Sequence, residues 1–234
     1  MDKLIKVDRI ATVVEAMQLE ALGVDIIGVS MNKTRAYTDN RFLDRIAVCE
    51  IANSLAKAKL AVEIDPIYTD LSALIEQVKL AYIQVPNPEI VPLETAKILQ
   101  TEGIEIIYSG ISAADDDDSS WILSRYIEEG GVNVAFYQVD VLATIKNSWN
   151  FFKSECPKYP DVLQIEDVAK LSEEYPMIIS LDFTEGNVLE VLNRFPSSKG
   201  ISLRLSDEKN RSDLHCFNYQ AVLDILRFLK KGET

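Results

Sequence analysis

Short apolar runs alternate with helical patterns along the whole chain. The first run, Leu4-Ile5-Lys6-Val7-Asp8, predicts a buried strand that ends on a carboxylate, and a helical pattern follows it at once. Strands of this kind are predicted at residues 4–8, 25–30, 60–65, 81–85, 104–109, 132–139, 177–181 and 200–205. Helices are predicted at residues 12–22, 40–58, 71–78, 93–100, 120–129, 165–174, 187–194 and 220–230, with an extra one at 144–153.

This order of strands and helices predicts a parallel sheet. The strands are apolar almost throughout, as expected when helices cover both faces. Eight strand–helix pairs in 234 residues favour a single (β/α)8 TIM barrel in one α/β domain, residues 1–234, because such barrels typically take about 250 residues. The alternative is an open doubly wound sheet, but no glycine-rich fingerprint follows the first strand to support it.

Carboxylates stand where two of these strands end. Asp8 closes the first strand, and Asp140 follows the sixth. In parallel α/β proteins, ligands bind and chemistry occurs at the carboxyl ends of the strands. Both side chains are therefore candidates for the functional site.

Composition and charge exclude several classes of function. The chain is 47% hydrophobic and carries a net charge of −13, which argues against nucleic-acid binding and more weakly against anionic substrates. No apolar run of about 18 residues predicts a membrane span. Nothing at the amino terminus resembles a cleavable signal, so we expect a cytoplasmic protein.

The cysteines and the histidine give weak signals. Cys49, Cys156 and Cys216 are widely spaced and form no CxxC pair, so we expect reduced thiols, with Cys49 in the core. His215 is the only histidine and precedes Cys216. A loop histidine without a catalytic role is favoured over a Cys–His catalytic pair.

Two further clusters allow alternative interpretations. The run Asp115-Asp116-Asp117-Asp118 is favoured as the acidic start of a helix, where negative charge is stabilised, over a cation site. The aromatic group at 149–152, in the long connection 141–161, is interpreted as packing residues. The alternative is that it lines or covers the mouth of the barrel.

Motifs along nearly the whole chain resemble phosphoribosylanthranilate isomerase, the (β/α)8 barrel of tryptophan biosynthesis. Lys6-Val7-Asp8-Arg9-Ile10-Ala11 resembles the family's Lys-Ile-Cys-Gly-Ile-Thr, and Asp25-Ile26-Ile27-Gly28-Val29 resembles its Asp-Ala-Ile-Gly-Phe. Further matches, in chain order, are Lys33-Thr34-Arg35 with Ser-Pro-Arg, Leu60-Ala61-Val62-Glu63-Ile64 with Val-Gly-Val-Phe-Val, Tyr82-Ile83-Gln84-Val85-Pro86-Asn87 with Val-Val-Gln-Leu-His-Gly, Ser180-Leu181-Asp182-Phe183 with Ala-Gly-Gly-Leu, and residues 200–208 with Gly-Val-Asp-Val-Ser-Ser-Gly-Val-Glu.

The resemblance implies an aldose–ketose isomerisation without a cofactor or a metal. By position, Asp8 stands where the family has its cysteine base, and Asp140 stands where it has its aspartic acid. Two carboxylates can divide acid and base roles if their environments separate their pKa values. Arg35 is implied to contact the substrate, and Gln84, Asp182 and Arg204 are the other binding candidates.

The phosphate site of the family does not match this sequence. The family exposes backbone N–H groups in glycine-rich turns after strands six, seven and eight. Here the turn after Asp140 holds no glycine, and Asp182 lies in the turn after the seventh strand. A like charge at about 4 Å costs about 4 kcal/mol at an effective dielectric of 20. Arg204 compensates for only part of this loss, so a non-phosphorylated ligand is expected.

Three functions follow as hypotheses. The first is a diverged isomerase acting on a small ligand at the barrel mouth, with Asp8 and Asp140 as the acid–base pair. The second is an inactive relative that serves as a binding or assembly module. The third is an authentic tryptophan-pathway isomerase, which the changed phosphate turns disfavour. The resemblance implies a monomer or a homodimer.

Overall fold

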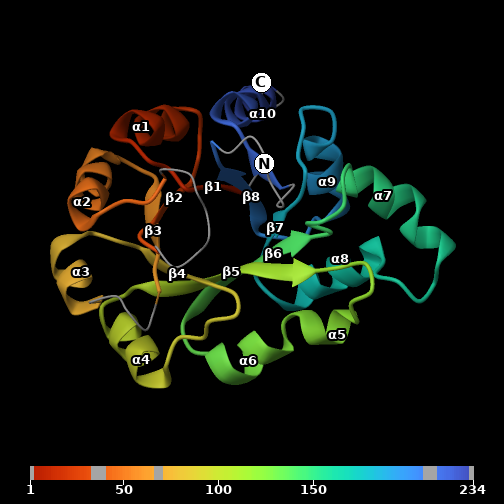
Figure 1. Cartoon of the computed structure of the whole chain (residues 1–234), viewed down its shortest axis with the longest axis horizontal. Coiled ribbons are helices and arrows are strands. Elements are labelled where there is room, and N and C mark those ends of the chain that lie inside the picture. The colour runs from red at the N-terminus through yellow and green to blue at the C-terminus, as the bar shows by residue number, and fades with distance from the viewer. Residues whose placement is uncertain (1–2, 33–40, 66–70, 208–214, 232–234) are drawn as a thin grey trace.

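The strands form a closed parallel barrel (Figure 1). The computed structural model describes residues 3–32, 41–65, 71–207 and 215–231. Strands pair in chain order from first to eighth, and the first also pairs with the eighth, which closes the sheet on itself. The barrel strands are β1 (Leu4–Asp8), β2 (Ile26–Ser30), β3 (Lys59–Glu63), β4 (Tyr82–Pro86), β5 (Glu105–Ala113), β6 (Val134–Val141), β7 (Met177–Ser180) and β8 (Gly200–Leu205). The predicted (β/α)8 barrel is confirmed.

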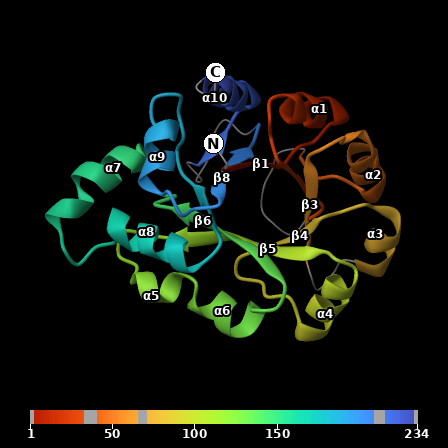
Figure 2. The same ribbon diagram turned by 180° about the vertical axis from the view of Figure 1, so that it is seen from behind.

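Helices surround the barrel in chain order, as the two opposite views show (Figures 1 and 2). The last helix lies beside the first and completes the ring. A hydrogen bond joins the two, from the Tyr219 hydroxyl of the last helix to Gln18 Oε1 of the first at 2.8 Å. The helices are α1 (Val13–Ala21), α2 (Arg45–Ser54), α3 (Leu71–Gln77), α4 (Leu93–Thr101), α5 (Ser119–Ile122), α6 (Ser124–Gly130), α7 (Ser148–Ser154), a short 3-10 turn (Cys156–Lys158), α8 (Ile165–Glu174), α9 (Val188–Arg194) and α10 (Tyr219–Lys231). No helix among the described residues is both long and apolar enough to cross a membrane.

The interior of the barrel is apolar at one end and polar at the other. The main core fills the space between the strands and the helices. A separate small apolar cluster fills the amino end of the barrel interior and consists of Ile26, Ala61, Tyr82 and Ile107. Side chains further along the same strands, toward their carboxyl ends, are polar or charged. The polar end is where a functional site is expected.

The helix predicted at 40–58 is wrong at both ends, because contacts with distant residues limit it. Asp44 caps the first turn of α2, because its Oδ1 accepts a hydrogen bond of 2.9 Å from the backbone N–H of Ala47. The preceding residue, Leu43, donates its N–H to the carbonyl oxygen of Ser30, so the chain there follows β2. Beyond α2, the Glu20 carboxylate accepts successive backbone N–H groups and holds the chain out of the helix.

The single helix predicted at 120–129 is also wrong, because it is divided in two. Leu123 is the last capping residue of α5 and precedes the first residue of α6. The Ser124 hydroxyl donates to the carbonyl oxygen of Trp121 at 3.0 Å. A side chain that competes for backbone groups in this way is a common cause of a helix break.

The strands differ from the prediction at their ends. β5 continues past Gly110, whose φ of 65° allows a bulge, and pairs with β6 as far as Ala113. β6 extends to Val141, so Asp140 lies within the strand rather than after it. A ninth strand, β9 (Cys216–Phe217), pairs with β8 and was not predicted, because two residues give no periodic signal. The extra helix predicted at 144–153 begins later, as α7.

Candidate functional site

Polar side chains occupy alternate positions near the carboxyl ends of several strands. Successive residues of a strand face opposite sides of the sheet, so residues two apart share a face. The Lys6 ammonium on β1 donates to Gln138 Oε1 on β6 at 2.9 Å. These two strands are not neighbours in the sheet, so the hydrogen bond crosses the barrel interior. Lys6 and Asp8 therefore both face the inside of the barrel.

Asp8 is held by hydrogen bonds on both oxygens. Lys6 donates to Oδ1 and forms a buried ion pair with it. Oδ2 accepts hydrogen bonds from the Gln138 amide at 3.1 Å and from the Ser202 hydroxyl at 2.9 Å. Asp8 is 3% exposed, so its carboxylate depends on these protein groups for its stabilisation.

The charge of Lys6 keeps Asp8 ionised. Burial alone would raise the pKa of Asp8, but the charge and hydrogen bond of Lys6 outweigh it. With smaller contributions from Arg204 and Ser202, the net effect holds the pKa of Asp8 below its ordinary value. Burial also lowers the pKa of Lys6, against the attraction of Asp8 and Glu63. Lys6 and Asp8 thus form a buried ion pair in which each charge stabilises the charged form of the other.

Gly28 and Arg9 both lie next to Asp8 and both have unusual backbone requirements. A Cβ added to Gly28 on β2 would meet the Asp8 carboxylate, so only glycine leaves room for it. Arg9 stands where the resembling family has glycine, and it keeps a left-handed φ of 66°. Its buried guanidinium lies 5.8 Å from the centre of the Phe42 ring. Backbone strain of this kind is often found at functional sites.

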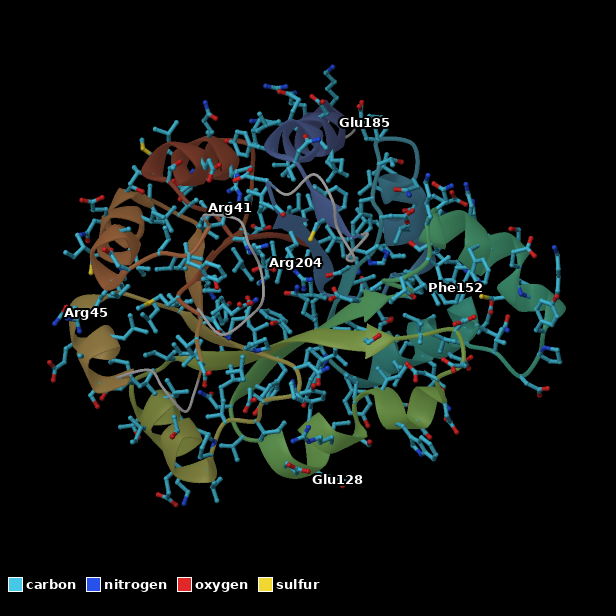
Figure 3. All side chains as sticks on the ribbon, in the orientation of Figure 1. Arg41, Arg45, Glu128, Phe152, Glu185 and Arg204 are labelled. Atoms are coloured by element: carbon cyan, nitrogen blue, oxygen red, sulfur yellow. The ribbon has the colours of Figure 1, made fainter. Side chains whose placement is uncertain are left out.

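Asp140 and Arg204 form a second ion pair inside the barrel. An Arg204 guanidinium nitrogen lies 3.1 Å from Asp140 Oδ2, and both side chains are about 10% exposed, at 10% and 11%. Figure 3 shows Arg204 within the ring of helices, whereas Arg45, Glu128 and Glu185 lie at the periphery. Asp140 Oδ1 is buried, and no described protein group donates a hydrogen bond to it.

Glu63 adds a third carboxylate, at the end of β3. Its side chain accepts hydrogen bonds from the Ser30 hydroxyl at 3.1 Å and from the Gln84 amide at 3.2 Å. Strand register places Ser30, Glu63 and Gln84 side by side on three consecutive strands. Glu63 lies near enough to Lys6 to raise the pKa of Lys6, and the charge of Arg204 lowers the pKa of Lys6. The three carboxylates and two cations therefore form one electrostatic cluster.

Asp182 lies apart from this cluster, beyond the end of β7. Its Oδ1 accepts hydrogen bonds from the Ser148 hydroxyl and from the backbone N–H of Trp149 at 3.2 Å. His215, which is 2% exposed, places Nε2 3.1 Å from the Ser148 oxygen. Residues that follow β6, β7 and β8 thus meet around the Ser148 hydroxyl.

The remaining sequence predictions have mixed outcomes. Arg35 lies outside the described residues. Cys49 is only partly buried and packs against the edge of the core rather than in it. Asp118 caps α5, and hydrogen bonds from the backbone and hydroxyl of Ser120 lower its pKa. No cluster of metal-ligating side chains occurs among the residues that the structure describes.

The aromatic residues of α7 are packing residues, as expected. Trp149 is 2% exposed and contacts the rings of Phe152 and Phe195 edge to face. Its indole N–H donates to Glu190 of α9 at 2.9 Å. Figure 3 shows Phe152 on α7 and away from Arg204, and its side chain is fully buried there.

The sequence predictions missed several members of the buried cluster. Three of these lie two positions before a residue that was already a candidate: Lys6 before Asp8, Gln138 before Asp140 and Ser202 before Arg204. Because residues two apart on a strand share a face, a search for polar residues at this spacing would have found them. Glu63 lies where the resembling motif has an apolar residue, and this substitution was the available signal.

Comparisons with known proteins identify the fold. No protein-family model and no curated protein matches the sequence. Phosphoribosylanthranilate isomerase from Pyrococcus furiosus is 14% identical, with a TM-score of 0.64 over 98% of this chain and 99% of that chain. The enzyme from Thermotoga maritima is 12% identical, with a TM-score of 0.68 over 98% and 99% of the two chains. The chain therefore has the (β/α)8 fold that is seen in phosphoribosylanthranilate isomerases.

Proposed function

We propose that this protein is an aldose–ketose type isomerase that acts on a small, non-phosphorylated ligand at the barrel mouth. The observation that carries the proposal is the buried cluster of three carboxylates and two cations at the carboxyl ends of the strands. Burying each ion costs several kcal/mol, and replacing a buried ion pair by apolar side chains is often neutral or stabilising. A chemical role gives a reason for these charges.

Asp140 and Arg204 suit the oxygen chemistry of this reaction. An aldose–ketose isomerisation moves one proton between neighbouring carbons and one between their oxygens. The Arg204 guanidinium would stabilise the negative charge that develops on the substrate oxygen. Asp140 would accept the hydroxyl proton through its Oδ1, which has no described protein donor, and return it to the other oxygen.

Asp8 is better suited to hold Lys6 than to act as a base. The position of Asp8 implies the base role, but a proton accepted there would break the ion pair with Lys6. The lowered pKa of Asp8 has the same physical cause. In this proposal Asp8 stays ionised during the reaction and holds Lys6 in place inside the barrel.

Replacing Asp140 by asparagine tests the proposed function. Because positioned acid–base groups contribute about 10²–10⁴-fold to rate, Asp140→Asn is expected to lower turnover at least about 100-fold. The measurement is the conversion of a panel of unphosphorylated aldoses to ketoses, followed by NMR. Glu166→Gln, an exposed carboxylate on α8, is the control. If the wild type converts none of the sugars in the panel, the proposal is contradicted.

Asp182 supports the choice of a non-phosphorylated ligand. A solved phosphoribosylanthranilate isomerase has been seen in complex with reduced 1-(o-carboxyphenylamino)-1-deoxyribulose 5-phosphate. In this chain, the donors after β6 already serve the Asp182 carboxylate. An authentic tryptophan-pathway function is accordingly disfavoured. We expect no rescue of a tryptophan auxotroph that lacks its isomerase.

Removing the Asp182 carboxylate should open this place to an external anion. Asp182→Gly frees the Ser148 hydroxyl and the Trp149 N–H, and it removes a like charge. Inorganic phosphate is expected to bind the variant at least about tenfold more tightly than the wild type, which corresponds to about 1.4 kcal/mol. Phosphorus NMR or calorimetry measures this change. Equal binding by the two proteins would show that Asp182 does not exclude phosphate.

A second candidate, a non-catalytic binding module, is favoured by the saturation of Asp8. Both oxygens of this carboxylate are occupied by protein donors. This alternative requires a partner whose binding survives both Asp8→Asn and Asp140→Asn. In either case we expect a single-domain cytoplasmic protein, a monomer or homodimer, that does not bind nucleic acid, in keeping with its net charge of −13.

A further inference from the structure

Glu63 differs from the other buried carboxylates in the charge of its partners. Lys6 is paired with Asp8 and Arg204 is paired with Asp140, whereas the groups hydrogen-bonded to Glu63 are a hydroxyl and an amide. Protonating Asp8 therefore leaves Lys6 without its anion, whereas Arg204 faces the charged substrate oxygen when Asp140 takes up the hydroxyl proton. Protonating Glu63 breaks no ion pair among the contacts of the described residues.

The partners of Glu63 also suit either of its protonation states. The Ser30 hydroxyl donates to the carboxylate and can equally accept from the acid. Gln84 donates through its amide nitrogen, and its Oε1 is buried without a described partner. A flip of this amide turns an acceptor toward Glu63, so the protonated acid also keeps a hydrogen bond. Lys6 and Arg204 can only donate.

Glu63 lies at the end of the barrel where reacting groups are found in (β/α)8 enzymes. It is the last residue of β3, at the carboxyl end of the barrel, and it is 8% exposed. Strand register aligns it with Ser30 and Gln84 on either side, which limits its side-chain movement. It belongs to the same electrostatic cluster as Lys6 and Arg204.

We propose that Glu63 is the carbon base of the site, the role that sequence position gave to Asp8. This inference rests on the proposed isomerase function. In the forward step the Glu63 carboxylate takes the proton from carbon 2 of the open-chain aldose. The C–H electron pair forms the enediolate, whose charge lies on oxygen 1 beside Arg204. Glu63 then returns its proton to carbon 1, while Asp140 moves the hydroxyl proton from oxygen 2 to oxygen 1, so no proton or electron is gained or lost.

Affinity labelling tests the reactive carboxylate without any need for turnover. Glycidol is a small unphosphorylated epoxide, and a carboxylate oxygen attacks its ring to form an ester while the opened oxygen takes a proton from water. Peptide mass spectrometry of the labelled full chain is expected to place the ester on Glu63 and to show none there in Glu63→Gln. Exposed Glu166 sets the background level. An ester mainly on Asp8, or none above background, would overturn the assignment.

Deuterium exchange tests the carbon-base step itself. In heavy water with unphosphorylated aldopentoses and aldohexoses, the wild type is expected to place deuterium at carbon 1 of the ketose and at carbon 2 of any aldose that re-forms from the enediolate. Glu63→Gln should lower that rate at least about 100-fold, Glu63→Asp should recover part of it, and both should keep the wild-type melting temperature. Exchange by Glu63→Gln at the wild-type rate overturns the inference but leaves the isomerase proposal in place. Labelling of Glu63 without wild-type exchange supports the reactive carboxylate and contradicts the isomerase proposal.

Discussion

Replacing Lys6 by methionine is expected to lower the free energy of unfolding by about 3–5 kcal/mol, the usual result of removing one partner of a buried ion pair. Methionine has nearly the same length, so the loss of packing is small. The effect comes from the Asp8 carboxylate, which stays buried and loses its only directly bonded cation among the described residues. Chemical denaturation at neutral pH measures the change.

A double variant separates the charge effect from a packing effect. Lys6→Met combined with Asp8→Asn removes both charges and keeps an amide that can hydrogen bond to Gln138 and Ser202. The double variant is expected to regain most of the stability that the single variant loses, because the two sites interact directly. Lys79→Met, at an exposed lysine after α3, should change stability by less than about 1 kcal/mol. An equal loss in the single and double variants would contradict the explanation.

The same pair predicts a pH dependence with a definite sign. The pKa of Asp8 in the folded protein is held below its ordinary value, chiefly by Lys6 against the effect of burial. A lowered pKa stabilises the fold above the unfolded value of about 3.9, and this contribution is lost as the pH falls through the folded value. Without Lys6, burial raises the pKa of Asp8 instead. The stability deficit of Lys6→Met should therefore shrink as the pH is lowered from neutral toward about 4.

Replacing Gly200 by alanine is expected to destabilise the protein by about 3 kcal/mol, at the upper end of the over-packing range. Gly200 pairs with Leu4 where β8 meets β1 and the barrel closes. An added Cβ would meet the carbonyl oxygen of Leu4 and would lie 2.7 Å from its carbonyl carbon and 2.8 Å from its nitrogen. These are backbone atoms, so no side chain can rotate away to relieve the clash.

Gly186→Ala provides the matched control for this second prediction. A Cβ at Gly186 would lie 3.7 Å from the Thr184 hydroxyl oxygen, an ordinary contact. Its stability should stay within about 0.5 kcal/mol of the wild type. Thermal denaturation of the two variants side by side measures the difference. A Gly200→Ala protein as stable as Gly186→Ala would show that the β1–β8 seam can open without loss.

Most of the barrel could be predicted from local patterns, but the partners inside it could not. The pattern at residues 165–174 and 200–205 predicts elements that the structure places at the same bounds. The spacing of apolar residues is a local property of the chain, so the sequence shows it directly. The Lys6–Gln138 contact joins residues 132 positions apart, which no local pattern reports.

The candidate site shows the same division residue by residue. The positions of Asp8 and Asp140 near strand ends could be predicted, because strand ends follow from apolar runs. Their pairing with Lys6 and Arg204 could not, because it depends on which strands face each other across the closed barrel. Glu63 became a candidate only when its neutral partners, Ser30 and Gln84, were known.

By itself, therefore, the sequence determined the fold class and the end of the barrel where carboxylates gather, because both depend on short-range hydrophobic periodicity. Only the tertiary structure decided which carboxylate is held by a cation and which has neutral partners. The physical reason is that electrostatic environment is set by side chains from distant strands brought together in a buried space. That environment makes Asp8 an anchor for Lys6 and makes Glu63 the proposed base.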